Sequence, residues 1–181
     1  MKEVEKIVYQ GKIFEVVQFP VKVGSQEVIF EKVRRSPGTR LIIIKGHQIL
    51  LTKEFRQELG RDDYRLPGGK VFDTLNEYNK ALHQDLTQEV LKAAKKECLE
   101  ETGLLPTKIA FFDVVHAGAT IDWDLFYFLV TDFDVKKQKL EKGERISVEW
   151  KTFTEAKNMC LNRKISEDRT VGVLLRFLLT T

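Results

Sequence analysis

Alternating hydrophobic and polar residues predict β-strands along the first third of the chain. Short runs rich in Val, Ile and Phe are separated by Gly11 and by Gly24-Ser25. Two further runs flank Gly46-His47, a two-residue connection typical of a β-hairpin. The strands expected here span residues 7–10, 13–19, 27–33, 41–45, 48–52 and 64–66.

The middle part of the chain has the residue spacing of α-helices. Thr74-Leu75-Asn76-Glu77 has the form of a capping box that opens a helix. Further on, apolar residues recur every four positions and predict a helix with one inward face: Leu86, Val90, Ala94 and Cys98. Gly103 suits a helix C-terminal cap, and Pro106 discourages continuation of the helix.

The last part of the chain mixes both patterns. We expect strands at 109–115, 125–130 and 147–150. A second capping box, beginning at Thr152, opens a short helix to about Leu161. Ser166 is placed to cap a final helix over residues 167–179. Strands mixed with a central helix and C-terminal helices indicate an α+β fold or a layered sandwich.

Composition and charge limit the kinds of protein that this chain can be. The 181 residues are 43% hydrophobic and 31% charged, enough for one buried core. The net charge of +3 comes from interleaved acids and bases, so no nucleic-acid partner is expected. The longest apolar runs, such as 41–44, are too short to span a membrane, and the charged N-terminus lacks a signal-peptide core. Two cysteines argue against a disulfide framework, and a cytoplasmic protein is the expectation.

One stretch carries candidate chemistry. Glu97, Glu100 and Glu101 lie at spacings that place them on one helix face, beside the apolar stripe. Like charges this close repel, so a hard divalent cation, Mg²⁺ or Mn²⁺, is the natural partner. Upstream, Pro67-Gly68-Gly69-Lys70 forms a turn without side chains at its centre, where the backbone can approach a ligand closely.

These two features together resemble the Nudix hydrolase signature, Gly-x5-Glu-x7-Arg-Glu-apolar-x-Glu-Glu-x-Gly-apolar. The matching residues are Gly69, Glu97, Cys98 in the apolar place, Glu100, Glu101, Gly103 and Leu104. Three departures stand out. Lys96 replaces the arginine, Gln88 falls on the first glutamate with Glu89 beside it, and the interval after Gly69 is 13 residues longer than the pattern. The excess lies in the insertion 71–87, which we expect to form an extra helix or a helical lid.

The resemblance extends over most of the chain and is greatest to the ADP-ribose pyrophosphatase branch. It implies a Nudix-type α/β/α sandwich with a mixed sheet and N-terminal antiparallel strands. The domain organisation it suggests is an N-terminal strand extension over 1–38 and a Nudix domain over 39–181, with the insertion inside the Nudix box. The same branch implies a homodimer built partly by the N-terminal strands.

The activity implied is Mg²⁺-dependent hydrolysis of a nucleoside diphosphate linked to another moiety, with ADP-ribose or a nucleoside diphosphate sugar as first choice. The metal ligands implied are Glu97, Glu100, Glu101 and the Gly69 carbonyl. The general base is Glu97 or, in this branch, a late-loop residue, Glu144 with Glu141 in reserve. The candidates for contacting substrate are Arg56, Lys70 and Arg35, with Trp123 and Tyr127 as candidates for stacking on a base.

Other functions stay open at this level. Ala117 and Arg65 differ from residues usual in the ADP-ribose branch, so dinucleotides or modified nucleoside triphosphates are alternative substrates. A catalytically silent module that binds a nucleotide and regulates a partner is a second alternative, against which the three intact glutamates argue. A prenyl diphosphate isomerase is a third, but Cys98 falls on the apolar helix face and Cys160 near the C-terminus.

Overall fold

The computed structural model describes residues 5–57, 59–140 and 143–180. The elements, in chain order, are β1 (Lys6–Gln10), β2 (Phe14–Val23), β3 (Gln26–Arg35), β4 (Gly38–Lys45), β5 (Gln48–Arg56), β6 (Arg61–Arg65), α1 (Leu75–Ala81), α2 (Thr87–Thr102), β7 (Leu104–Val115), β8 (Ile121–Asp122), β9 (Leu125–Val135), β10 (Ile146–Thr152), α3 (Phe153–Leu161) and α4 (Asp168–Thr180).

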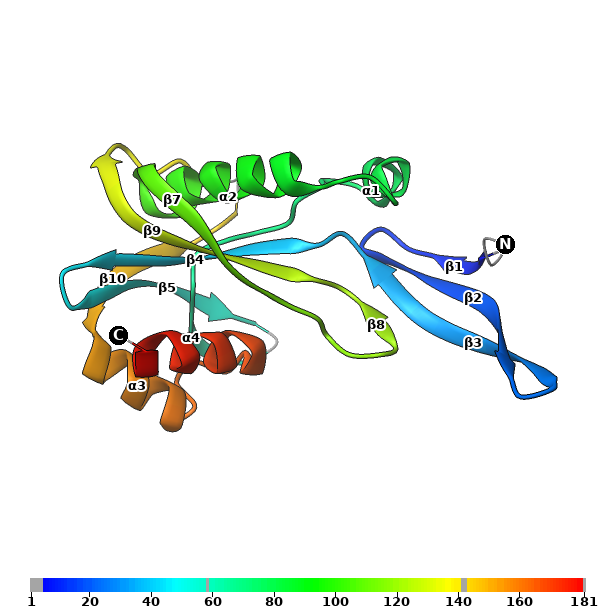
Figure 1. Ribbon diagram of the computed structural model, residues 1–181. Helices are drawn as coiled ribbons and strands as arrows, with labels where there is room; N and C mark the ends of the chain where they lie inside the picture. The colour runs from blue at the N-terminus through cyan, green and yellow to red at the C-terminus, as the bar shows by residue number, and fades with distance from the viewer. Residues whose placement is uncertain (1–4, 58, 141–142, 181) are drawn as a thin grey trace.

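A six-stranded mixed sheet forms the centre of the molecule. Its order is β10-β5-β4-β9-β7, with β6 paired to β5. The β4–β9 pair is parallel, whereas the other pairs of this sheet are antiparallel. Helix α2 covers one face and α3 with α4 cover the other, which confirms the predicted α/β/α layers (Figure 1).

Successive side chains of the central strands point to opposite faces of the sheet, so they contribute to two separate hydrophobic cores. Leu41, Ile43 and Leu50 pack toward α2, on Ala94 and Cys98 of its apolar stripe. Between them, Ile42, Ile49 and Leu51 pack toward the C-terminal helices. Both sets are fully or almost fully buried, so the central sheet is a rigid platform for whatever lies at its edges.

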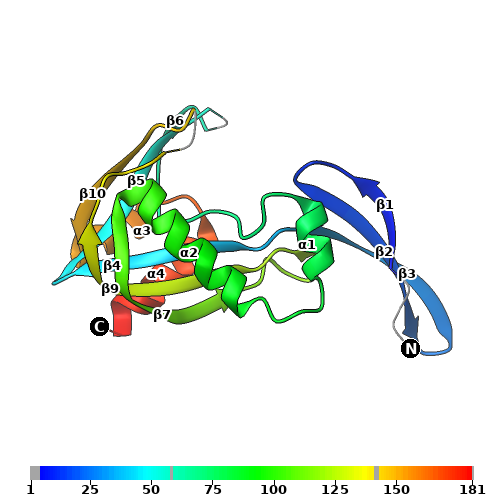
Figure 2. The same ribbon diagram turned by 90° about the horizontal axis from the view of Figure 1, so that it is seen from above.

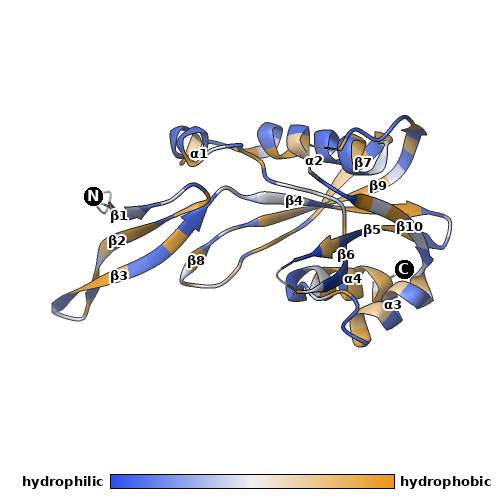
Figure 3. Ribbon diagram, turned by 180° about the vertical axis from the view of Figure 1, so that it is seen from behind, coloured by the Kyte–Doolittle hydropathy of each residue, from blue (hydrophilic) through white to orange (hydrophobic). Residues whose placement is uncertain are grey.

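The N-terminal strands form a second sheet, in the order β1-β2-β3-β8. We call β1, β2 and β3 the N-terminal arm, because they extend away from the central sheet in two perpendicular views (Figures 1 and 2). The predicted antiparallel N-terminal strands are therefore found, and β2 pairs with β3 over ten residue pairs, from Phe14↔Arg35 to Val23↔Gln26. Hydrophobic residues occur along the strands of the arm (Figure 3). Several of them are exposed, among them Ile29 at 56%.

Both predicted capping boxes are present, at Thr74–Glu77 and at Thr152–Glu155. The insertion thus contains the expected extra helix, α1. The final helix differs slightly from the prediction: it begins at Asp168, and the Ser166 hydroxyl predicted to cap it donates to Asp63 Oδ1 at 2.8 Å. In the described part of the chain, no helix has the length and apolar character needed to cross a membrane.

Candidate active site

Helix α2 positions the three glutamates. Its buried face carries Ala94 and Cys98, both 0% exposed, so the helix cannot rotate without breaking the core. Glu97, Glu100 and Glu101 follow on the adjoining face, near the end of the helix. The helix ends as predicted at Gly103, which is left-handed (φ 69°) and donates its N–H to the Leu99 carbonyl.

The glycine turn lies against the beginning of β4. The Leu41 N–H donates to the Pro67 carbonyl at 2.9 Å, and the Thr39 N–H donates to the Gly69 carbonyl at 2.8 Å. A Cβ on Gly68 would lie 2.1 Å from the Thr39 carbonyl oxygen. On Gly69, a Cβ would lie 2.4 Å from Glu97 Oε1. Backbone atoms therefore exclude a side chain at Gly68, whereas a side chain at Gly69 would displace the Glu97 carboxylate.

The turn and the helix meet through Glu101. Its Oε2 accepts the Gly68 N–H at 2.7 Å. Burial raises the pKa of Glu101 to about 8; the Gly68 hydrogen bond and Arg40 oppose this rise, while Glu97 and Glu144 add to it. Glu100 instead forms an ion pair with Lys96, with Lys96 Nζ 3.1 Å from Glu100 Oε2. Lys96 therefore reaches the carboxylate one helical turn later, as predicted.

A cleft opens beside these carboxylates and holds about 760 Å³ of space continuous with solvent. Its lining residues are Glu54, Arg56, Gly68, Gly69, Lys70, Glu97, Glu100, Glu101, Glu144 and Ile146. The structure therefore brings together all the predicted metal-site residues, Glu144, Arg56 and Lys70. Glu141 lies outside the described residues.

Glu54 was missed by sequence reasoning. It lies two residues before Arg56 on β5, hence on the same face of the strand, and its Oε2 is 2.8 Å from Arg56 Nη2. This i, i+2 relation to a candidate phosphate-binding arginine is the signal that could have identified it. Lys70 is turned toward Asp73 of the insertion, with Nζ 3.1 Å from Oδ1.

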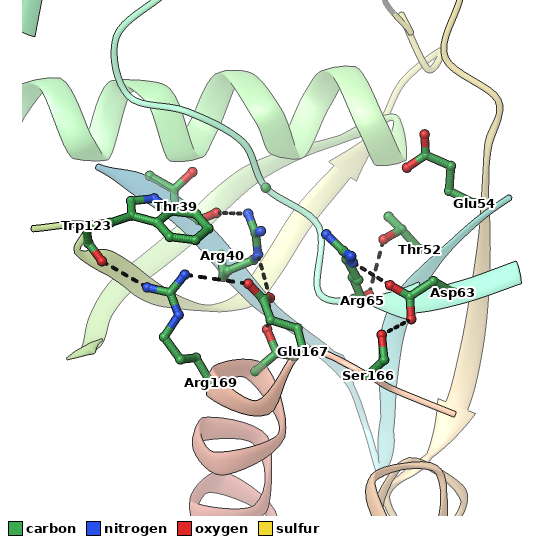
Figure 4. A network of polar contacts seen from close by, with 12 residues as sticks. Thr39, Arg40, Thr52, Glu54, Asp63, Arg65, Trp123, Ser166, Glu167 and Arg169 are labelled. Atoms are coloured by element: carbon green, nitrogen blue, oxygen red, sulfur yellow. Dashed lines mark hydrogen bonds and ion pairs between the residues drawn. The ribbon is translucent and has the colours of Figure 1, made fainter. Parts of the chain in front are cut away.

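A smaller polar pocket lies next to the cleft and shares Glu101 and Arg56 with it. We call it the inner pocket. Strand β6 supplies Asp63, whose carboxylate accepts Arg65 Nε at 2.6 Å and the Ser166 hydroxyl at 2.8 Å (Figure 4). These side chains fix the base of α4 to the sheet edge beside the cleft.

Arg35 is not among the residues that line the cleft. Its guanidinium carbon lies 4.0 Å from the centroid of the Trp123 ring, and that of Arg169 lies 3.9 Å from the same centroid. Trp123 therefore makes cation–π contacts with two arginines, one from β3 and one from α4. Tyr127 is 0% exposed in the core. The hypothesis that Tyr127 stacks on a base is therefore wrong, and stacking by Trp123 stays a prediction.

The donor set of the cleft suits a hard divalent cation. Carboxylate oxygens are the ligands that Mg²⁺ and Mn²⁺ prefer, and the mutual repulsion of Glu97, Glu101 and Glu144 would be relieved by a positive ion. Among the described residues, no three acidic, histidine or cysteine side chains already converge as a preassembled centre. Glu100 and Glu101 point instead to Lys96 and to the Gly68 N–H.

Comparison with known proteins decides the family. The family model described as the NUDIX domain matches residues 34–170. The chain belongs to the Nudix family. The sequence prediction of a Nudix hydrolase is thereby confirmed. Among solved structures, one described as an ADP compounds hydrolase has a TM-score of 0.74 at 15% identity, over 99% of this chain and 93% of the other. No curated protein sequence matches the chain.

The solved structure shares the fold over nearly the whole chain, N-terminal strands included, whereas the family model covers residues 34–170. Within this Nudix fold, the α2 glutamates and the glycine turn occupy one cleft despite the 13 extra residues between them. The insertion begins directly after Lys70, which lines the cleft, and ends where α2 begins. It therefore adds a helix without separating the two halves of the Nudix box.

Proposed function

We propose that this Nudix protein is a divalent-cation-dependent hydrolase of nucleoside diphosphates linked to a second moiety, with ADP-ribose as the favoured substrate. The observation that carries the proposal is the cleft itself. It combines the α2 glutamates, Glu144 and the cations Arg56 and Lys70 around a glycine turn. An acidic wall with two cations suits a cation–diphosphate complex better than a neutral ligand.

Under this proposal, Glu97, Glu100 and Glu101 hold the cation, with Mg²⁺ as first choice and Mn²⁺ as an alternative. A bound cation of this kind supplies charge neutralisation for the diphosphate and activates water. The Gly69 carbonyl offers the cation its second lone pair, because the first accepts the Thr39 N–H.

The protein groups have separate roles. Glu144 accepts the proton of the attacking water, since it lines the cleft from a loop facing α2. Arg56 and Lys70 bind the diphosphate oxygens and orient them. Glu54 keeps the Arg56 guanidinium directed along the cleft wall through its 2.8 Å ion pair.

The choice of ADP-ribose follows from the structural neighbour described as an ADP compounds hydrolase, which shares the fold over almost the full length of both chains. Cleavage would release AMP and ribose 5-phosphate. The test is a panel of ADP-ribose, nucleotide sugars, dinucleotides and modified nucleoside triphosphates, each with Mg²⁺ and with Mn²⁺, and with products identified by mass spectrometry. Absence of turnover on every compound, with retained binding of one of them, would refute the enzyme proposal.

A homodimer is part of the proposal. The N-terminal arm exposes large hydrophobic side chains, including Tyr9 at 54%, Ile29 at 56% and Phe30 at 46%. An apolar strand surface of this kind is costly in water and suits burial against a second copy. Sedimentation at several protein concentrations would measure the state, and a monomer throughout would contradict it.

A further inference from the structure

The insertion is anchored at both ends to other parts of the molecule. Helix α1 turns Leu75 and Tyr78 inward, at 6% and 7% exposed, while Asn76 and Glu77 face solvent. In two perpendicular views α1 lies beside the arm, at its junction with the central sheet (Figures 1 and 2). The insertion is therefore a packed element, and the helix in it does not cover the cleft as a lid.

The contact between α1 and the arm has a buried charge at its centre. Glu15 of β2 is 0% exposed, and its Oε1 accepts Arg34 Nε at 2.8 Å. Its second oxygen, Oε2, accepts Asn79 Nδ2 of α1 at 3.0 Å. A buried carboxylate that loses a donor is strongly penalised, so this hydrogen bond fixes where α1 sits on the arm.

The other end of the insertion reaches the cleft. The Phe72 N–H donates to Ser36 Oγ at 3.0 Å, and the Val71 N–H donates to the Pro37 carbonyl at 2.9 Å. Between this anchored segment and α1 lies Asp73, whose carboxylate is 3.1 Å from Lys70 Nζ. Asp73 directly precedes Thr74, the N-cap of α1. The position of α1 thus sets the position of the Asp73 carboxylate, which forms the ion pair with Lys70.

We propose that the insertion is a brace in which Asn79, as a positioning residue, fixes α1 on the arm through Glu15 and thereby holds Asp73 and Lys70 at the mouth of the cleft. The assignment rests on the proposed function, because it makes Lys70 a contact for the diphosphate. It gives the 13 extra residues a role in substrate affinity and links that affinity to the orientation of the arm.

The test compares Asn79→Ala with Asn76→Ala, the same change on the solvent face of the same helix. Asn79→Ala should raise KM roughly three- to tenfold with kcat within about twofold, since one hydrogen bond to a buried charge is lost. Asn76→Ala should behave as the wild type. In a double-mutant cycle, Asn79→Ala should add little to the KM of Lys70→Ala, because both act through the same contact.

An unchanged KM in Asn79→Ala, or full additivity with Lys70→Ala, would overturn the brace. Hydrogen exchange of residues 71–81 gives a readout that needs no turnover: it should accelerate in Asn79→Ala and not in Asn76→Ala. If the wild type hydrolyses nothing but this exchange difference is present, the proposed function fails and the anchoring of α1 stands. Equal exchange in both variants would refute the anchoring, whatever the activity.

Discussion

Replacing Gly69 by alanine tests the most confined contact of the cleft. The added methyl group would lie 2.4 Å from Glu97 Oε1 and 2.5 Å from Glu97 Cδ. Ordinary contact begins near 3.4 Å, so the carboxylate must move by about 1 Å. The obstructing atoms are the end of a flexible side chain, so the backbone can stay in place and the fold should survive.

A displacement of about 1 Å in a reacting constellation costs on the order of 100-fold in rate, or about 2.7 kcal/mol of barrier. We expect Gly69→Ala to lose about 100-fold in kcat/KM for the substrate found in the panel, with a thermal midpoint within a few degrees of the wild type.

The matched control is Gly172→Ala, where the added methyl group would find its nearest neighbour, Arg176 Nη1, at 3.8 Å on helix α4. This variant should keep full activity and gain slightly in stability. A folded Gly69→Ala protein that keeps its rate within about threefold would refute the reasoning, because the reaction would then tolerate a displaced Glu97.

Three further substitutions separate the roles of the cleft residues. Glu100→Gln should abolish cation-dependent hydrolysis, while the thermal midpoint changes little because the lost surface ion pair is worth under about 1 kcal/mol; full activity would contradict its role as a ligand. Glu144→Gln should lower kcat with a modest change in cation affinity, measured by titrating Mn²⁺; if it has no effect and Glu97→Gln is inactive, the base lies on the helix. Asp73→Asn should raise KM about two- to threefold, because Lys70 loses the ion pair that holds it at the mouth of the cleft, and an unchanged or lowered KM would argue against that contact.

Local signals explain what sequence reasoning predicted well. The four-residue spacing of Ala94 and Cys98 gave the correct buried face of α2, and Gly103 gave its end, because these depend on neighbours within one turn. Strand β7 begins at Leu104, well before the predicted residue 109. The predicted strand leaves Pro106 outside any strand. Pro106 lies instead at a register irregularity of the β7–β9 pair, where a residue without an N–H is tolerated.

Features made by tertiary pairing were not predictable. Strand β8 has two residues, and only its parallel pairing with β3 defines it. In the same way, Asp63 and Arg65 appear in the sequence as ordinary charged residues. They reach the inner pocket because β6 pairs with β5 and because Ser166 approaches from the beginning of α4. The three glutamates were predictable since helical spacing alone places them together.

The two cation–π contacts of Trp123 give the molecule an internal optical reporter. The chain has two tryptophans, and the other, Trp150, stacks on Phe133 at the opposite side of the sheet. Indole emission responds to nearby charge, and of the two cations over Trp123 one comes from β3 of the arm and the other from α4. A swing of the arm against the body would move Arg35 relative to the indole, so a Trp150→Phe protein would signal that motion by fluorescence without an attached dye.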